Sequence, residues 1–463
     1  MTASTDNQTM PAPEPPSATS APSRWAAVLL LVGVLGLYVA TVDLESSSND
    51  TYTAGLGAWV IATSGDPSLE DLPAGSYRAN TWTQLNERTG DLVVSRAPGP
   101  VAAPVPAELV RRVLTGSETY SLVPQAVTAA TLTALAVVFL FLALRTRVAL
   151  APSLLAALAF ALASPVWSVS ANAMWTHPLT LLGVLGMAYF AARERWWLVG
   201  VLGGVAVVGR LHTALIVAVL GCGMAWALRR PLIAVQVGLA GLGGVALATV
   251  WTYWVYGRWS PTGGYQARAT AERITTGLEG TRDGVLVNQL GMWVSPGYGI
   301  LVWTPVLLLL LPAVVRGWHQ VPAWARLLPV GGLLYTLAQA QLNTFTGGDG
   351  FFGYRHGLEL LATVTPCVAI AATGHLGAVS RRLLGPVLAL QLAAFAIGAT
   401  SEAWFIVFVD AWRDNSLALA LRHEPAYGVL VGAFVLVGYL AGRVWQERAA
   451  ATAQHDAEPA ATH

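Results

Sequence analysis

Residues 123–144 read VPQAVTAATLTALAVVFLFLAL, an apolar run without a single charged side chain. A helix needs about 20 such residues to cross the hydrocarbon core of a membrane. The whole chain shares this character, because 55% of its 463 residues are hydrophobic, only 11% are charged and the mean hydropathy is +0.56. Soluble domains carry about 25% charged residues. The sequence therefore predicts an all-α protein that is embedded in a membrane.

Apolar stretches of similar length recur along the chain, and they predict a polytopic bundle of about 12 transmembrane helices. The candidate spans are 25–42, 123–144, 148–166, 172–192, 196–209, 211–228, 232–256, 298–315, 327–343, 356–376, 386–409 and 426–442. We expect the bundle to occupy residues 24–448, between disordered tails at 1–23 and 449–463. We interpret 25–42 as a retained anchor helix and not as a cleaved signal peptide.

Arginine falls at every second boundary between these spans. The pairs are Arg145/Arg147, Arg193/Arg195, Arg229/Arg230, Arg316/Arg326, Arg381/Arg382 and Arg443/Arg448. Because basic residues favour the cytoplasmic side, the pattern predicts an inner-membrane protein with both termini in the cytoplasm. The absence of Lys and the abundance of Ala, Gly and Pro are typical of a bacterium with GC-rich DNA. Two long outer loops result, 43–121 and 257–296, and amphipathic stretches at 52–62 and 107–114 are expected to lie flat at the interface.

The stretch 196–228 decides the orientation of everything that follows it. As one straight helix it would be about 50 Å long, whereas the hydrocarbon core is about 30 Å thick. We therefore predict two short helices that meet at Arg210 and His212 near the outer surface. A single tilted span would instead reverse the topology of the rest of the chain.

Twelve ionisable side chains map at or just below the outer face. They are Asp43, Glu45, Asp50, Arg96, His177, Arg210, Asp349, Arg355, His356, Glu359, Glu402 and Asp410. Such groups are costly at membrane depth and usually line a site, whereas a transporter would place them near the midplane. The net charge of +1 gives no support for a nucleic-acid partner. Cys222 and Cys367 lie in apolar segments, which argues against a disulfide framework or a cysteine metal site.

Four segments occur in a distinctive order: GDLVVSRAPG at 90–99, MWTHP at 174–178, SPGYGILVWTP at 295–305 and GGDGFFGYR at 347–355. They resemble the elements G-x-x-Y-S-K-x-P-G, W-x-H-P, S-P-G-R-G-L-x-x-x-x-P and G-G-x-x-F-G-x-R-Y of bacterial membrane proteins. Those proteins belong to the GT-C glycosyltransferase superfamily, which includes protein O-mannosyltransferases and aminoarabinose transferases. The likeness in topology extends over nearly the whole chain.

The resemblance implies transfer of a sugar from a polyprenyl-phosphate donor to a glycan or protein acceptor on the outer face. Such enzymes keep an essential carboxylate early in the first outer loop. Asp50, within NDTYTA at 49–54, resembles that element best, and Asp43 and Glu45 compete with it. Thr51 stands where many members have a second acid. Arg96 replaces the usual Lys, which retains the charge and adds a planar fork that suits phosphate.

A carboxylate near the acceptor hydroxyl can act as the general base of an inverting transfer. The leaving lipid phosphate then needs guanidinium groups to hold its charge. The candidate catalytic residues are thus Asp50, Asp43 and Glu45. The candidate substrate-binding residues are Arg96, His177, Arg210, Arg355, His356 and Glu359. No metal ligand or cofactor is assigned, although the sequence leaves open the use of a divalent cation.

Each of these residues also has a plainer interpretation. The early acids can solvate the end of the first helix, and Arg96 and Arg210 can contact lipid phosphates. His177 can cap its helix, while His356 and Glu359 lie at i, i+3 and can pair with each other. Tryptophans near span ends form an interfacial belt or stack on a sugar: Trp175, Trp293 and Trp303. Two further functions stay open, a transporter or flippase of a lipid-linked sugar and a catalytically inactive membrane scaffold.

Overall fold

The structure is a computed structural model that describes residues 21–42, 44, 48–73, 75–262, 264, 282–348, 350–401 and 410–457. Within these residues the chain is mostly helical, and the one sheet is a two-stranded ribbon of β1 (Thr83–Leu85) and β2 (Leu92–Val94). Asp43, Glu45, Asp349 and Glu402 lie outside the described residues, as do much of the N-terminal tail and part of the second outer loop.

Among the described residues, five helices are long and apolar enough to cross a membrane. They are α1 (Ala21–Ala40), α5 (Val123–Leu144), α10 (Leu232–Tyr256), α17 (Ala378–Thr400) and the segment Pro425–Val444 of α19 (Pro425–Ala457). These helices support the prediction of a helical membrane protein. They do not amount to the expected bundle of about 12 spans. The predicted C-terminal tail from residue 449 begins inside α19, which continues to Ala457.

Several predicted spans are shorter because the backbone breaks at particular residues. Between α6 (Leu150–Leu162) and α7 (His177–Ala192) the chain forms a π-helical turn, η1 (Val166–Ser170), and α7 begins only where Pro178 supplies a preset φ. Pro305 likewise separates α13 (Ile300–Trp303) from α14 (Val306–Gly317). The other helices in this half are α12 (Arg282–Val294), η4 (Trp318–Gln320), α15 (Ala323–Leu342) and α16 (Leu358–Ala372).

The stretch 196–228 is broken at Arg210, as the sequence predicts. α8 (Trp196–Gly209) ends there, the short η2 (Leu211–Thr213) follows, and α9 (Ala214–Ala227) begins. A Cβ atom added to Gly203 would lie 2.8 Å from a methyl group of Val217. Since these residues stand equally far from Arg210 on its two sides, α8 and α9 fold back on each other as a helical hairpin.

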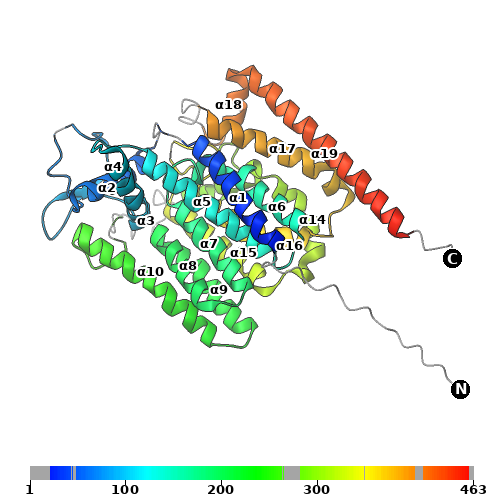
Figure 1. The fold of residues 1–463 in the computed structure, drawn as a ribbon, viewed down its shortest axis with the longest axis horizontal. Coiled ribbons are helices and arrows are strands. Elements are labelled where there is room, and N and C mark those ends of the chain that lie inside the picture. Colours follow the sequence, from blue (N-terminus) through cyan, green and yellow to red (C-terminus); the bar gives the residue numbers. More distant parts are fainter. Residues whose placement is uncertain are drawn as a thin grey trace.

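The elements of the predicted first outer loop gather at one end of the bundle, beside the start of α5 and the end of α10 (Figure 1). They are α2 (Asn49–Ser64), the β-ribbon, α3 (Pro98–Ala102) and α4 (Val105–Thr115). The amide of Asn86 donates a 3.1 Å hydrogen bond to the carbonyl of Val255 and fastens the ribbon to α10. The stretch 52–62, expected at the membrane surface, is instead buried on most of its sides within α2.

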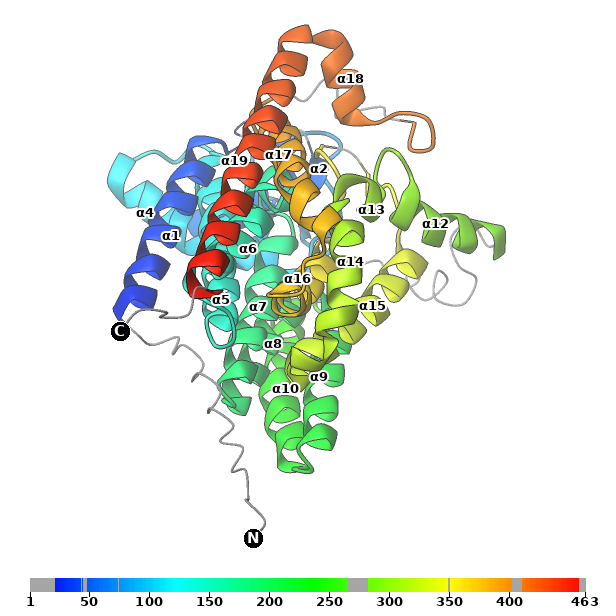
Figure 2. The ribbon, with the colours of Figure 1, turned by 90° about the vertical axis from the view of Figure 1, so that its right-hand side faces the viewer.

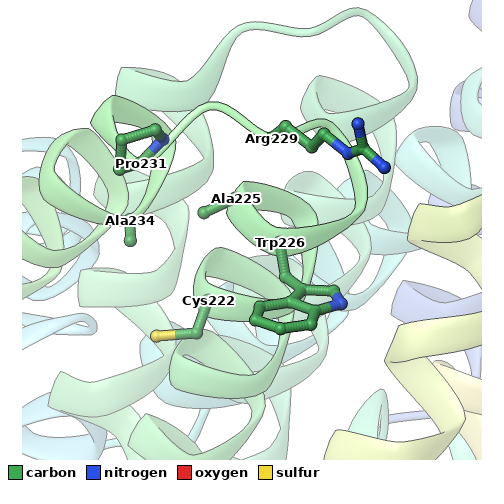
Figure 3. Close-up of a pocket in the computed structure, with 6 residues that line it drawn as sticks. All are labelled: Cys222, Ala225, Trp226, Arg229, Pro231 and Ala234. Carbon is green, nitrogen blue, oxygen red and sulfur yellow. The ribbon is translucent and has the colours of Figure 1, made fainter.

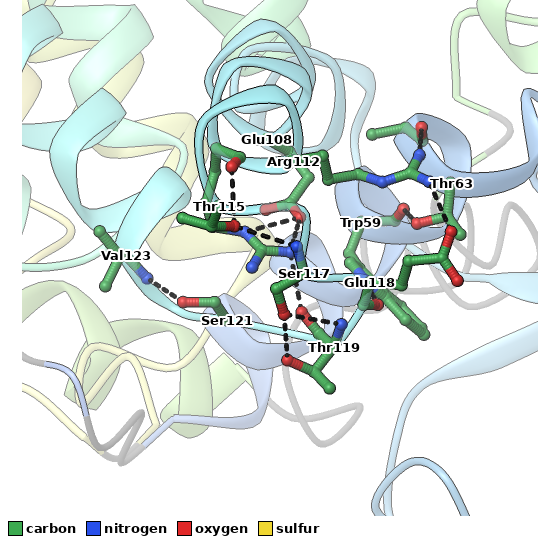
Figure 4. A network of polar contacts seen from close by, with 12 residues as sticks. Trp59, Thr63, Glu108, Arg112, Thr115, Ser117, Glu118, Thr119, Ser121 and Val123 are labelled. Carbon is green, nitrogen blue, oxygen red and sulfur yellow. Dashed lines mark hydrogen bonds and ion pairs between the residues drawn. The ribbon is translucent and has the colours of Figure 1, made fainter.

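The stretch 107–114 does form an amphipathic helix, α4. Its polar side faces α2, because Arg112 donates hydrogen bonds to the Ala62 carbonyl at the end of α2 and to Glu118 (Figure 4). Trp59 of α2 donates to the Glu118 carbonyl at 2.9 Å. The apolar side of α4 points outward, with Val113 and Leu114 being 85% and 78% exposed.

At the edge of the bundle α19 lies along α17 as an antiparallel pair, and α18 (Ser416–His423) precedes α19 (Figure 2). The backbones approach closely where Gly385 faces Gly438. The amide of Gln446 donates to the Arg381 carbonyl at 3.0 Å, which joins the C-terminal half of α19 to the start of α17. Most of the buried core lies elsewhere, among α5, α7, α15 and α16.

Candidate functional site: an aspartate between two arginines

The Asp50 carboxylate is held between two guanidinium groups. Its Oδ1 accepts from Arg96 at 2.9 Å, and its Oδ2 accepts from Arg355 at 2.8 Å. All three side chains are nearly buried, with exposures between 11% and 13%. Charge-assisted hydrogen bonds of this length are strong in partly dry surroundings. Asp50, Arg96 and Arg355, which are candidates from three separate segments of the sequence, thus form one cluster.

The position of Asp50 in the first turn of α2 favours its negative charge. Ser48 caps the helix, with its hydroxyl accepting from the Asp50 amide at 3.2 Å, and the N-terminal end of a helix attracts anions. Burial raises the pKa of the Asp50 carboxyl, but Arg96 and Arg355 outweigh it and lower the pKa from 3.8 to about 2. Arg210 adds to this lowering, so its charge acts on the same carboxylate.

Arg96 is placed by contacts of its backbone and its side chain. Its amide donates to the hydroxyl of Tyr256 at 3.1 Å, and that hydroxyl donates to the Arg96 carbonyl at 2.6 Å. Tyr256 ends α10 and is itself buried. The guanidinium carbon lies 5.3 Å from the ring centre of Trp82, which adds a cation–π contact.

Arg355 ends the glycine-rich turn between α15 and α16. Gly347, Gly348, Gly350 and Gly353 all have positive φ, a backbone conformation that glycine adopts without strain. The Arg355 guanidinium carbon lies 4.3 Å from the ring centre of Trp175, within cation–π range. Trp175, considered for stacking on a sugar, therefore supports an arginine in this structure.

A second polar layer lies among the apolar helices. His177, at the start of α7, contacts Glu359, near the start of α16, with 2.8 Å between Nδ1 and Oε1. The hydroxyl of Thr180 donates to the same carboxylate oxygen at 2.6 Å. His177 and Glu359 have no exposed side-chain surface. Glu359 thus pairs with His177, 182 residues away, and not with His356 as its spacing suggested.

Arg210 belongs to the same layer. Its guanidinium donates to the Tyr335 hydroxyl at 2.9 Å and to the Gln339 carbonyl oxygen at 3.3 Å. The ring of His212 stacks on Tyr335 and contacts the same Gln339 oxygen at 2.6 Å. Tyr335 and Gln339 are not among the residues predicted from the sequence, although their i, i+4 spacing places two polar groups on one face of an apolar helix.

The remaining candidate, His356, contacts the residue at the start of the glycine-rich turn. Its Nδ1 lies 3.1 Å from the Thr344 carbonyl, so it braces the base of that turn. Of the predicted site residues in the described part of the chain, Asp50, Arg96 and Arg355 are in direct contact. His177, Arg210 and Glu359 form the layer behind them. Asp43 and Glu45 cannot be placed, because they lie outside the described residues.

A separate cavity of about 540 Å³ lies at the turn between α9 and α10 (Figure 3). Its lining is mostly apolar and consists of Cys222, Ala225, Trp226, Arg229, Pro231 and Ala234. This turn lies at the opposite end of α10 from Tyr256, which holds Arg96. The cavity is therefore distinct from the Asp50 cluster.

The fold and the site define a helical membrane protein in which Asp50, Arg96 and Arg355 form a nearly buried cluster beside α2 and the β-ribbon. The chain matches no family model and no curated protein sequence. The likeness to the GT-C superfamily consequently depends on the four sequence motifs alone.

Proposed function

We propose that this protein is a membrane glycosyltransferase that moves a sugar from a polyprenyl-phosphate donor to a glycan or protein acceptor of the cell envelope. The observation that carries the proposal is the placement of Asp50 between Arg96 and Arg355. A carboxylate that can serve as a base and two cations that can hold a phosphate lie in one cluster, and an inverting transfer needs groups of both kinds.

The charge balance favours an anionic ligand. Counting Arg96, Arg355 and Arg210 against Asp50 and Glu359 leaves one excess positive charge in a region of low polarity. In the described part of the chain, the Nε atoms of Arg96 and Arg355 are buried without a hydrogen-bond partner. Unsatisfied buried donors cost free energy, which a phosphate oxygen would recover. A sugar phosphodiester carries one negative charge, which matches the excess.

The arrangement also suggests how Asp50 becomes a base. A carboxyl group with a pKa of about 2 takes up a proton weakly. When a phosphate shares the guanidinium groups of Arg96 and Arg355, the positive field on Asp50 falls and its pKa rises toward the ordinary value. Donor binding would thereby activate the carboxylate toward the acceptor hydroxyl, while the arginines hold the leaving phosphate. A lipid tail would lie against the surrounding apolar helices.

The proposal requires the end of the bundle that carries α2, α3 and α4 to face outward. The shorter apolar helices would then cross the membrane together with the five long ones, for about 12 spans and cytoplasmic termini. The hairpin at Arg210 returns the chain to the inner face. A reporter domain fused after Arg230 is therefore expected to report cytoplasm, and an external signal there would refute this topology.

The function can be tested by analysing lipid-linked sugars in cells that lack the protein. We expect a polyprenyl-phosphate sugar to accumulate and one envelope glycan or glycoprotein to lose its modification. The wild-type gene should reverse both effects. Asp50→Asn should not, because the amide cannot accept the proton.

Asp71→Asn is the matched control, since Asp71 is an exposed acid of the same loop, and it should behave as wild type. Full complementation by Asp50→Asn would exclude Asp50 as the base and would favour a flippase, which needs no proton acceptor. An unchanged pool of lipid-linked sugars in the deletion strain would refute the proposed function as a whole and favour a scaffold.

A further inference from the structure

Two segments that are far apart in the sequence touch at two neighbouring points. One segment contains Trp175 and His177, and the other contains Arg355 and Glu359. The Arg355 guanidinium lies over the Trp175 ring, 4.3 Å from its centre, while His177 contacts Glu359 at 2.8 Å. The second contact is fully buried, whereas the first lies beside the Asp50 cluster.

The buried contact is the stronger of the two. His177 and Glu359 are shielded from water, so their hydrogen bond cannot be exchanged for one to solvent. Thr180 donates to the same oxygen of Glu359 and fixes the carboxylate rotamer further. Removing one partner would leave a polar group buried without compensation, which is strongly unfavourable. This contact therefore joins α7 rigidly to α16.

The distance along the chain from Glu359 to Arg355 is short. The Leu358 amide closes a turn on the Arg355 carbonyl at 3.2 Å, and His356 is tied to Thr344. Gly347 has little room opposite Arg355, since a Cβ atom added to it would lie 2.9 Å from Nε. These contacts connect the backbone at Glu359 to the segment that carries the Arg355 guanidinium.

We infer that His177 and Glu359 are a positioning couple whose contact holds the Arg355 guanidinium between Trp175 and Asp50, ready for a phosphate. The couple acts on the ligand only through Arg355. The identity of the anion in this inference rests on the proposed function. The placement of Arg355 by His177 and Glu359 does not depend on it.

The first test measures binding of undecaprenyl phosphate to the purified protein in lipid nanodiscs, with undecaprenol as the uncharged comparison. Glu359→Ala should weaken binding of the phosphate about tenfold, or about 1.4 kcal/mol. Glu359→Gln and His177→Asn should stay close to wild type, because each conserves the hydrogen bond. Gln391→Ala is the control, since it removes a buried polar link between other helices.

The decisive comparison places Glu359→Ala in an Arg355→Gln background. If the couple acts through Arg355, the second substitution adds nothing to the loss of phosphate binding. Additive losses would overturn the inference and would indicate that Glu359 contacts the ligand itself. Equal losses of phosphate binding in Glu359→Ala and Gln391→Ala would show that Glu359 contributes only to the stability of the fold. That result would also overturn the inference.

The second test needs no ligand. Phenylglyoxal modification of Arg355, followed by mass spectrometry and normalised to the exposed Arg88, should be slow in the wild type. It should become several-fold faster in Glu359→Ala and remain slow in Glu359→Gln and Gln391→Ala. Unchanged modification in Glu359→Ala would refute the positioning role. If modification of Arg355 becomes faster in Glu359→Ala while the wild type fails to bind the phosphate, the proposed function is refuted and the positioning role of His177 and Glu359 is supported.

Discussion

The carboxylate of Asp50 lies 2.8 Å from the guanidinium of Arg355, although 305 residues separate them in the chain. The contact joins the first turn of α2 to the glycine-rich turn before α16. Arg96, which follows β2, contacts the same carboxylate from a third segment. The two guanidinium groups and the Asp50 carboxylate together carry one positive charge. Neutralising Asp50 would raise that charge to two.

Substituting Asp50 should therefore separate binding from turnover. Asp50→Asn removes the negative charge that competes for Arg96 and Arg355, so we expect undecaprenyl phosphate to bind several-fold more tightly. Transfer of the sugar should be lost. Titration of the purified variant in nanodiscs measures the affinity, and Asp71→Asn should leave it unchanged. Weaker binding by Asp50→Asn would contradict competition between the carboxylate and a phosphate.

The same ion pairs predict a dependence of stability on pH. Because folding lowers the pKa of Asp50 from 3.8 to about 2, its contribution is complete above pH 3.8 and is lost as pH falls toward 2. The contribution amounts to about 2 kcal/mol. Thermal unfolding of wild type and Asp50→Asn should therefore differ at pH 5 and converge as pH falls toward 2. A difference that is constant over this range would rule out the linkage.

Two adjacent glycines make it possible to separate the effect of crowding the Arg355 side chain from the effect of backbone strain. Gly347 and Gly348 have φ of +73° and +81°, so alanine at either position costs about 1–2 kcal/mol. Only Gly347→Ala also crowds Arg355, because the new methyl group would lie 2.9 Å from Nε, against 3.9 Å from Nη2 for Gly348→Ala. We expect similar losses in melting temperature but weaker phosphate binding in Gly347→Ala alone. Equal binding by both variants would argue against crowding of Arg355.

The outward face of α4 should lie in the lipid headgroup region. Val113 and Leu114 are exposed there while Arg112 anchors the opposite side, an arrangement typical of interfacial helices. A spin label at Val113→Cys, in a Cys222→Ser background, should be shielded from an aqueous relaxation agent. A label at Thr89→Cys, on an exposed turn of the same loop, should be accessible. Equal accessibility at both positions would place α4 in water.

The candidate residues could be found from the sequence, but most of their partners could not. Asp50, Arg96 and Arg355 stand out because ionisable groups beside apolar spans are rare and costly. The partner of Glu359 was predicted wrongly, since i, i+3 spacing favours His356 whereas tertiary packing brings His177 to the same carboxylate. Local periodicity describes one helix at a time and carries no information about which helix packs against it.

The lengths of several apolar helices were overestimated for a similar reason. Hydropathy identifies each apolar stretch but does not fix where a helix begins. Prolines set two of these starts, because α7 begins at His177 with Pro178 in its first turn and α14 begins directly after Pro305. The break at Arg210 was predictable, because a straight helix over 196–228 would exceed the thickness of a membrane.

Composition and hydropathy alone determined that this chain is helical and belongs in a membrane, because burial of apolar side chains in lipid depends on their amount and spacing and not on their partners. Only the tertiary structure decided that Asp50 is held by Arg96 and Arg355, with His177 and Glu359 behind them. Contacts between distant segments are set by how helices pack and turns close, and a single sequence does not encode them in any local pattern.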